Sequence, residues 1–279
     1  KIGQLLGLSP KGLIFTSGAT EANNLALRGT TCLFEDNCAA IVSSIEHACV
    51  DESAKRLMQR GVTIKVAPVT VSGTVDLKQL EDLCRTTKNL KLISVMAVNN
   101  ETGVIQPLRE ISRIAKTYGV LLHTDAVQAI GKVPLSLLQV ADLISISAHK
   151  LNGPKGIGCL WISEGVRLDP LIVGGGQEAG IRSGTCPVPL IVAFAETIRL
   201  CLTENAWQVS INTALRNLEA EISRQVPGAK VNGLNAPRVS TISNISFPSQ
   251  QLVVDAIRGL AISSGAACGC SKPSLLKFC

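Results

Sequence analysis

Short apolar runs alternate with amphipathic segments along the first half of the chain. The apolar runs are rich in β-branched residues and cover residues 13–17, 39–44, 63–69, 91–98, 120–126 and 141–147. Each run predicts a buried strand, and the amphipathic segments between the runs predict helices. Strands that are apolar on both faces and separated by helices predict an α/β fold, with a mainly parallel sheet covered by helices on both faces.

The pattern changes near residue 206. A long amphipathic helix is predicted over residues 207–226, followed by a strand-like run at 239–247 and a further helical segment at 251–264. We therefore expect a large domain over 1–205 and a smaller α+β domain over 206–279. Helix-like segments stand at both ends of the sequence, so we expect it to be a piece of a longer chain.

Composition narrows the class of protein. Hydrophobic residues make up 46% and charged residues 17% of the 279 residues, which is typical of a globular chain. The net charge of +6 is spread without long basic runs, and the aromatic residues are five Phe, two Trp and one Tyr, which argues against a nucleic-acid-binding surface. No apolar stretch reaches membrane-spanning length, and the first residues do not form a signal peptide. We expect neither a nucleic acid nor a membrane as a partner.

Ten cysteines are scattered along the chain without paired CxxC motifs, so we interpret them as reduced thiols in a reducing compartment. Four of them stand in apolar segments and are expected to be small core residues: Cys32, Cys84, Cys159 and Cys201. The exception is the polar loop SSGAACGC, which carries Cys268 and Cys270.

Lys150 stands beside His149, just after the apolar run at 141–147 and before the turn at 152–154. Burying an ammonium group without a partner is costly, so this segment alone favours a lysine that reaches solvent. A lysine held in a polar pocket has another use, because its amine can form a Schiff base with a carbonyl compound.

Further motifs lie where predicted strands end. TSGATEANN, residues 16–24, leads into a helix whose first N–H groups and dipole suit an anion. VNNETG, residues 98–103, predicts a polar turn, and GGGQEAGIRSGT, residues 174–185, is a glycine-rich loop that offers a second anion cradle. Asp125 ends an apolar run, where a lone carboxylate is costly but a protonated pyridine nitrogen would stabilise it. An anion site, a buried Asp and a strand-end Lys are together the parts that bind pyridoxal 5′-phosphate, so they favour the Schiff-base interpretation of Lys150.

Seven runs occur in one order between Ile14 and Cys268: TSGATEANNLAL, EHACV, VNNETGVIQP, LLHTDAVQAIGKVPL, SISAHKLNGPKGIG, GGGQEAGIRSGT and SSGAAC. In these runs the chain resembles the cysteine desulfurases that supply sulfur for iron–sulfur clusters, within the class V aminotransferase family. The resemblance implies pyridoxal phosphate as the cofactor and the fold type I of pyridoxal-phosphate enzymes. It also implies that 1–205 is the cofactor-binding domain without its N-terminal part, and that 206–279 is a partial small domain with the cysteine loop.

The resemblance implies a role for individual residues. Lys150 would form the Schiff base and move protons, His47 would stack on the cofactor ring and act as acid and base, and Asp125 would pair with the pyridine nitrogen. Thr185 would reach the phosphate bound by a neighbouring subunit, which implies a homodimer. The other implied cofactor contacts are Asn100 and Gln128 beside the phenolic oxygen, and Ala19, Thr20, Ser147, Ala148 and His149 around the phosphate. His123 has no matching role and is expected to be structural.

Cys268 falls where the family carries its nucleophile. The implied reaction converts L-cysteine to L-alanine and leaves a persulfide on Cys268, which passes to an iron–sulfur scaffold or a sulfur-carrier protein. The resemblance also implies that Cys268 can act as a transient ligand of an iron–sulfur cluster. Cys270 departs from the family pattern, and a Cys268–Cys270 pair is either an inhibitory disulfide or neutral. The small-domain Arg that binds the substrate carboxylate in the family is absent from these residues.

Two alternatives stay open at this point. One is a selenocysteine lyase, which uses the same residues, and the other is a non-catalytic remnant or scaffold with the same fold. The sequence leaves the compartment open between the cytoplasm and a mitochondrion-type organelle.

Overall fold

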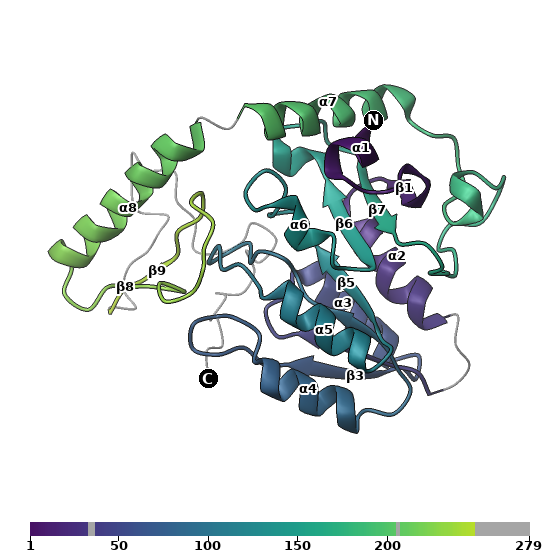
Figure 1. Ribbon diagram of the computed structural model, residues 1–279, viewed down its shortest axis with the longest axis horizontal. Coiled ribbons are helices and arrows are strands. Elements are labelled where there is room, and N and C mark those ends of the chain that lie inside the picture. The colour runs from purple at the N-terminus through teal and green to yellow at the C-terminus, as the bar shows by residue number, and fades with distance from the viewer. Residues whose placement is uncertain (33–36, 205–206, 249–279) are drawn as a thin grey trace.

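A computed structural model describes residues 1–32, 37–204 and 207–248. Its main feature is a seven-stranded sheet with helices on both faces (Figure 1). The strands are β1 (Leu13–Thr16), β2 (Ala39–Ser43), β3 (Thr63–Ala67), β4 (Leu90–Ser94), β5 (Leu121–Asp125), β6 (Leu143–Ser147) and β7 (Gly158–Ile162). They are arranged in the order β1-β7-β6-β5-β4-β2-β3.

The sheet is parallel except for one strand. Neighbouring strands from β3 through β6 pair in parallel, whereas β7 is antiparallel to both β6 and β1. The mainly parallel α/β fold expected from the apolar runs is therefore confirmed. The sequence pattern did not predict β7, because its five residues, GCLWI, follow a glycine-rich turn and no α-helix separates them from β6.

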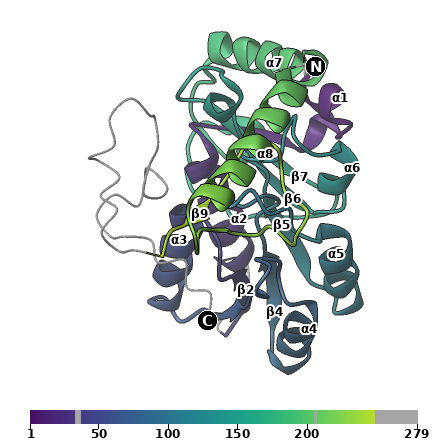
Figure 2. The ribbon, with the colours of Figure 1, turned by 90° about the vertical axis from the view of Figure 1, so that its left-hand side faces the viewer.

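The α-helices are α1 (Ile2–Leu6), α2 (Ala19–Cys32), α3 (Ala48–Met58), α4 (Leu77–Thr86), α5 (Leu108–Thr117), α6 (Leu135–Leu138), α7 (Val188–Thr203) and α8 (Trp207–Gln225). Three short 3-10 helices are η1 (Pro10–Gly12), η2 (Ala148–Leu151) and η3 (Glu178–Gly180). Helices α2 and α3 cover one face of the sheet, while α4 and α5 cover the other (Figure 2). Within the described ranges, no helix has the length and apolar character needed to cross a membrane.

Each face of the sheet has its own hydrophobic core. One cluster joins Leu25 of α2 and Val50 of α3 to the apolar side chains of the strands. The other joins Leu80 of α4 and Ile111 of α5 to the opposite sides of the same strands. The inner strands are therefore mostly buried on both faces, which explains why they appear in the sequence as continuous apolar runs, whereas the edge strand β3 is largely exposed. Of the cysteines assigned to the core, Cys84 and Cys159 are buried, Cys201 is half-buried, and the side chain of Cys32 is outside the described set.

The segment after α7 forms a separate unit beside the sheet (Figure 1). It contains α8 and a two-stranded ribbon of β8 (Lys230–Val231) and β9 (Ile245–Ser246). Only part of the strand expected at 239–247 forms, because the Val239 N–H donates to the carbonyl of Gly103 at 2.9 Å instead of continuing the ribbon. The domain boundary at 205/206 and the small-domain assignment of 206–279 stay predictions.

This unit is joined to the loop after β4. Val104 forms a β-bridge with Arg238, and the Ile105 N–H donates to the carbonyl of Pro237 at 2.8 Å. Both guanidinium Nη atoms of Arg238 donate to the Glu219 carboxylate of α8, at 2.9 and 2.8 Å, so the ion pair fixes α8 to the same junction. The unit therefore reaches the turn that carries Asn100.

Candidate active site

The predicted site residues follow strands that run in the same direction. In an open α/β sheet, ligands bind beyond the carboxyl ends of such strands. Ala19 and Thr20 follow β1, His47 follows β2, Asn100 follows β4, Asp125 and Gln128 lie at the end of β5, and Ser147, Ala148, His149 and Lys150 end β6 or form η2. The topology thus brings all these predicted residues to one edge of the sheet. Thr185 lies separately, on the exposed loop before α7.

Asp125 is a buried carboxylate with two neutral donors. Its Oδ1 accepts the N–H of Val127 at 3.0 Å, and its Oδ2 accepts Nδ2 of Asn23 at 2.7 Å. Burial raises the pKa of Asp125 above its usual value because neither donor offsets the loss of hydration. A cationic partner such as a protonated pyridine nitrogen fits this carboxylate, because it would hold the charge that burial disfavours.

His47 is the N-cap of α3, and its ring orientation follows from its contacts. Its Nδ1 accepts the backbone N–H of Cys49 at 3.2 Å and lies 3.0 Å from the Cys49 Sγ. Burial raises the pKa of Cys49 to about 11, so at neutral pH the thiol is protonated and can also donate to Nδ1. With donors facing Nδ1, the neutral ring of His47 carries its proton on Nε2.

The side-chain amide of Asn23 connects Asp125 to Cys49, the residue that contacts His47. Its Nδ2 donates to the Cys49 Sγ at 3.1 Å as well as to Asp125. The Oδ1 of Asn23 is buried and has no hydrogen-bond partner among the described residues. His47, Cys49, Asn23 and Asp125 thus form one chain of polar contacts beneath the edge of the sheet.

Glu46 adds a second buried carboxyl group to this cluster. Its Oε1 accepts the Ser43 hydroxyl and the N–H of Met96, the latter at 2.8 Å, while its Oε2 has no partner among the described residues. Burial raises the pKa of Glu46 to about 8. The carboxyl group is therefore neutral at pH 7 and adds no negative charge beside Asp125.

An anion cradle lies between the start of α2 and the end of β6. The N–H groups of Ala19 and Thr20 belong to the first turn of α2, where amides have no partner within the helix. A Cβ on Gly158 would lie 2.6 Å from the Ile146 carbonyl and 2.8 Å from the Cα of Gly18, so glycine in β7 allows the loop to approach β6. A Cβ on Gly18 would meet only the Ser147 Oγ, at 3.9 Å, which leaves space there for a ligand.

The donors around this space suit a phosphate. The Ser147 Oγ lies 2.8 Å from Nδ1 of His149; Ser147 ends β6 and His149 lies in η2. Burial, with the charges of Lys150 and Lys155, lowers the pKa of His149, so the ring is neutral at pH 7. Backbone N–H groups, a hydroxyl and the dipole of α2 together form a donor set for an anion, and the residues present fit pyridoxal phosphate.

Lys150 is exposed on η2, and a second lysine lies near it. The Nζ of Lys132 donates to Oε1 of Gln128 at 2.6 Å. Burial lowers the pKa of Lys132, and the positive charge of Lys150 acts in the same direction. The oxygen of Gln128 is thus engaged by Lys132, and its amide nitrogen is the end that is left for a ligand.

The turn after β4 distinguishes two neighbouring asparagines. The Oδ1 of buried Asn99 accepts the N–H groups of Glu101 and Thr102, at 3.0 and 2.8 Å, so this side chain shapes the turn. Asn100 is half-buried, and its side chain is bonded to none of the described residues. It is therefore the asparagine available to a ligand.

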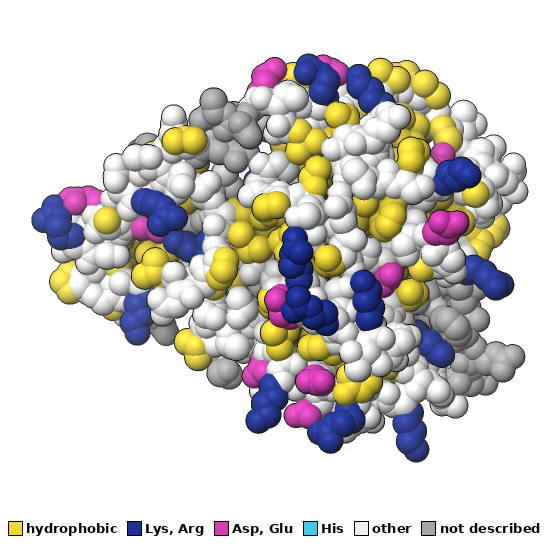
Figure 3. All heavy atoms as spheres, viewed as in Figure 1, with side chains coloured by type: hydrophobic (Ala, Val, Ile, Leu, Met, Phe, Trp, Pro, Cys, Tyr) yellow, Lys and Arg dark blue, Asp and Glu magenta, His cyan; other side chains and the backbone are white. Residues whose placement is uncertain are grey.

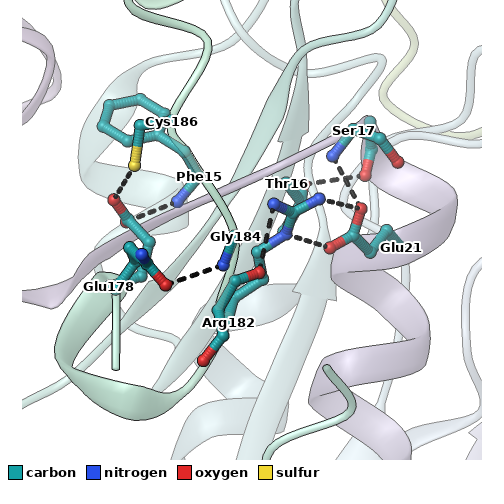
Figure 4. Close-up of polar contacts among 11 residues, drawn as sticks. Phe15, Thr16, Ser17, Glu21, Glu178, Arg182, Gly184 and Cys186 are labelled. Carbon is teal, nitrogen blue, oxygen red and sulfur yellow. Dashed lines mark hydrogen bonds and ion pairs between the residues drawn. The ribbon is translucent and has the colours of Figure 1, made fainter. Parts of the chain in front are cut away.

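The loop that carries Thr185 is fixed to β1 and α2 by two acidic residues (Figure 4). Glu178 accepts the N–H of Phe15 at 2.9 Å and the thiol of Cys186 at 3.2 Å. Glu21 accepts Nε of Arg182 at 2.8 Å. Glu178 has φ +49°, an uncommon conformation for a residue other than glycine, and this turn directs its carboxylate to β1.

Several of these residues were not predicted from the sequence. Asn23 lies one helical turn beyond the predicted Ala19 and Thr20, on the face of α2 that is otherwise apolar, and this polar residue on a buried stripe was the available signal. Cys49, Glu46 and Lys132 gave no comparable signal, because their roles depend on contacts between separate elements. Cys268 and Cys270 lie outside the described residues. Within the described part, no cluster of three His, Cys, Asp or Glu side chains could hold a metal ion.

Comparison with known proteins gives a consistent family assignment. The model of the family described as aminotransferase class-V matches residues 1–278. The chain is 41% identical to a mitochondrial cysteine desulfurase of Candida maltosa over 279 residues, and 41% identical to the cysteine desulfurase IscS of Rickettsia bellii over 274 residues; each alignment covers 96% of this chain. A solved structure titled SspA in complex with cysteine has a TM-score of 0.82 at 33% identity, covering 97% of this chain and 76% of that one.

The chain spans only part of the curated relatives that it matches: 56% of the Candida desulfurase and 66% of the Rickettsia desulfurase. The family match nevertheless includes all the elements that carry the site, from β1 to the loop before α7. The chain belongs to the aminotransferase class-V family and is similar, within it, to cysteine desulfurases.

Proposed function

We propose that this chain is the cofactor-binding part of a pyridoxal-phosphate-dependent cysteine desulfurase. The observation that carries the proposal is the position of the buried Asp125 at the same sheet edge as Lys150 and the anion cradle at α2. Class V aminotransferases use pyridoxal phosphate, and the relatives at 41% identity are named cysteine desulfurases. One solved relative holds cysteine, according to its title.

Each residue then has a task that its surroundings support. The first amides of α2, with Ser147 and His149, would hold the phosphate, and Asp125 would hold the protonated ring nitrogen. Asn100 and the amide nitrogen of Gln128 would face the phenolic oxygen. When bound, the cofactor withdraws electrons from the Cα of an amino acid and so makes its proton acidic.

Lys150 and His47 are the residues that would move protons. Lys150 offers an exposed amine on η2 for covalent attachment of the cofactor and for proton transfer at the substrate Cα. His47 presents its Nε2–H on the side of the ring away from Cys49, because its Nδ1 is engaged by that residue. His47 is thus suited to stack on the cofactor and to donate a hydrogen bond from Nε2, and its imidazolium form would donate a proton.

We assign the nucleophile to Cys268. Its thiolate would attack the sulfur of L-cysteine, so that the carbon–sulfur bond breaks, a sulfur–sulfur bond forms on Cys268 and L-alanine leaves after its carbon is protonated. The persulfide would pass to an iron–sulfur scaffold or a sulfur-carrier protein, with transient cluster ligation by Cys268 as a further step. The name of the Candida relative, a mitochondrial cysteine desulfurase, supports a mitochondrial setting, and a cytoplasmic setting stays the alternative.

A homodimer is part of the proposal. Two apolar side chains of α7, Val188 and Val192, are 60% and 63% exposed, and Val173 in the preceding loop is 77% exposed. Hydrophobic side chains also gather along the side of the molecule where α7 lies (Figure 3). A second copy packed on α7 would cover these residues and bring Thr185 to the neighbouring cofactor phosphate.

The test is product analysis with L-cysteine. The purified chain loaded with pyridoxal phosphate should release L-alanine and gain one sulfur atom, located on Cys268 by mass spectrometry. Cys268→Ser should still bind the cofactor but gain no sulfur, because a hydroxyl supplies almost no anion at neutral pH. Cofactor binding without alanine release would contradict the assignment and favour the non-catalytic remnant, and turnover of L-selenocysteine alone would favour the lyase.

A further inference from the structure

One carboxylate joins the loop that would hold the phosphate to the loop that carries Thr185. Glu21, in the first turn of α2, accepts the backbone N–H of Ser17 at 2.8 Å through Oε2. Its Oε1 accepts Nε of Arg182 at 2.8 Å, and Nη2 of Arg182 lies 3.5 Å from Oε2 (Figure 4). Ser17 precedes the start of α2, and Arg182 stands three residues before Thr185, so Glu21 connects the phosphate loop with the Thr185 loop.

This ion pair is sheltered, unlike most of the others. The side chains of Arg182 and Glu21 are 22% and 15% exposed, whereas those of the surface pair Arg85 and Asp82 are 67% and 52% exposed. Burial disfavours the charge of Glu21, but the hydrogen bonds from Arg182 and Ser17 outweigh burial and hold the pKa of Glu21 below its usual value. Glu21 is therefore ionised at neutral pH, and Arg182 balances its charge.

Glu21 also determines which amides are left for an anion. The N–H of Ser17 is used by the carboxylate, and the N–H of Ala22 donates to the Gly18 carbonyl at 3.1 Å. The amides of Ala19 and Thr20 lie between these two fixed positions and have no partner among the described residues. A negative charge beside a phosphate is unfavourable by itself, and the Arg182 guanidinium offsets the charge of the Glu21 carboxylate.

The Thr185 loop is also held by a hydrogen bond within the loop itself. The N–H of Gly184 donates to Oε1 of Gln177 at 2.9 Å, which closes the loop between Arg182 and Thr185. A cavity of about 160 Å³ opens between this loop and β1, lined by Ser17, Gly156, Arg182 and Thr185 among others. Loss of the ion pair would therefore remove the link between the Ser17 wall and the Arg182 wall of the cavity.

We propose that Glu21 and Arg182 are positioning residues, which fix the phosphate loop for its anion and hold the Thr185 loop in register with it. The proposal rests on the proposed function, because it takes the phosphate of pyridoxal phosphate as the anion. Neither residue needs to touch the cofactor: Glu21 acts through the Ser17 amide, and Arg182 acts through Glu21.

The test compares two ligands that differ only in the phosphate. Dissociation constants for pyridoxal phosphate and for pyridoxal are measured by absorbance titration of the wild-type chain, Glu21→Gln, Arg182→Gln and the double variant. Each single variant should bind pyridoxal phosphate about tenfold more weakly and bind pyridoxal as the wild type does. The double variant should lose hardly more than either single variant, because both changes break one contact.

The conservative variant and the control separate positioning from loss of folding. Arg182→Lys keeps the charge and should recover part of the lost phosphate-dependent affinity, whereas Arg85→Gln, at the exposed pair, should change neither constant. Circular dichroism reports the fold of each variant. Equal weakening for both ligands, additive losses in the double variant, or unchanged affinity for pyridoxal phosphate in folded Glu21→Gln would overturn the proposal. A wild-type chain that binds neither ligand would instead overturn the proposed function.

Discussion

Asn23 and Asp125 come from different elements, α2 and the end of β5, and meet in a buried hydrogen bond of 2.7 Å. The two residues are 102 positions apart in the sequence, so the contact exists only because α2 packs on the face of the sheet beside β5. Asn23 is fully buried, and its second amide hydrogen serves Cys49. The Asn23 amide thus donates hydrogen bonds both to Asp125, which is proposed to bind the pyridine nitrogen, and to Cys49, which contacts His47.

Asn23→Leu should therefore weaken the site and the fold together. The change leaves Asp125 with a single donor, and an unsatisfied buried acceptor costs about 1–3 kcal/mol. We expect a fall of that size in the free energy of unfolding, measured by urea denaturation, and weaker binding of pyridoxal phosphate. Asn217→Ala, at an exposed residue of α8, is the control and should change neither value. Unchanged stability and affinity in Asn23→Leu would show that Asp125 does not depend on this amide.

Lys150→Ala should abolish covalent attachment of the cofactor. Borohydride treatment of the wild-type chain with pyridoxal phosphate should add one reduced cofactor, located on Lys150 by peptide mass spectrometry. Lys132→Ala is the matched control, because Lys132 is the other amine at this edge and its pKa is lowered by burial. Attachment that survives in Lys150→Ala and disappears in Lys132→Ala would show that the cofactor lysine had been assigned wrongly.

Glu46→Gln should change how stability depends on pH. The pKa of Glu46 is about 8 in the folded chain, against an ordinary value of 4.5. Between these values the folded state keeps a proton that the unfolded state has released, so the wild-type free energy of unfolding falls as pH rises from about 4.5 to about 8. At pH 7 the free energy of unfolding of the wild type should be lower than at pH values below 4.5 by on the order of 3 kcal/mol from this group.

Glutamine imitates the neutral acid, so Glu46→Gln should lack that dependence. The variant should be more stable than the wild type at pH 8 and lose this advantage below pH 5, measured by urea denaturation across the range. A constant difference between the two proteins at all these pH values would mean that Glu46 is ionised in the folded state.

Val192→Asp should convert a dimer to a monomer. The side chain is 63% exposed on α7, and a charge there would be buried without a partner if a second copy packs on this helix. Sedimentation velocity should show the wild type as a dimer and the variant as a folded monomer. Val209→Asp places the same charge on α8 at a residue that is 72% exposed, and it should leave the dimer intact. A wild type that sediments as a monomer would contradict the homodimer.

The sequence predicted what depends on local pattern and failed where contacts are long-range. The apolar runs located six strands to within a few residues, most of them because strands buried on both faces have no polar alternation. The seventh strand, β7, was missed because no α-helix separates it from β6. Polar residues at strand ends predicted the position of Asp125 and Lys150, since parallel strands bring their carboxyl ends together.

The remaining part of the site could not be obtained in the same way. Cys49 lies two residues after His47 in the sequence, but its effect on Nδ1 depends on the N-cap geometry of α3. The contact between Glu21 and Arg182 spans 161 positions and follows from the path of the loop before α7. A neutral Glu46 is a consequence of complete burial, which the pattern EHACV does not indicate.

The bond between Glu178 and the Phe15 N–H also bears on how this protein avoids unwanted association. β1 is the last strand on its side of the sheet, and an outward N–H there is the group by which a strand from another chain would pair. Glu178 already accepts that hydrogen at 2.9 Å and places a negative charge in the path of an incoming backbone. The bond thereby disfavours strand addition and amyloid-like stacking at β1.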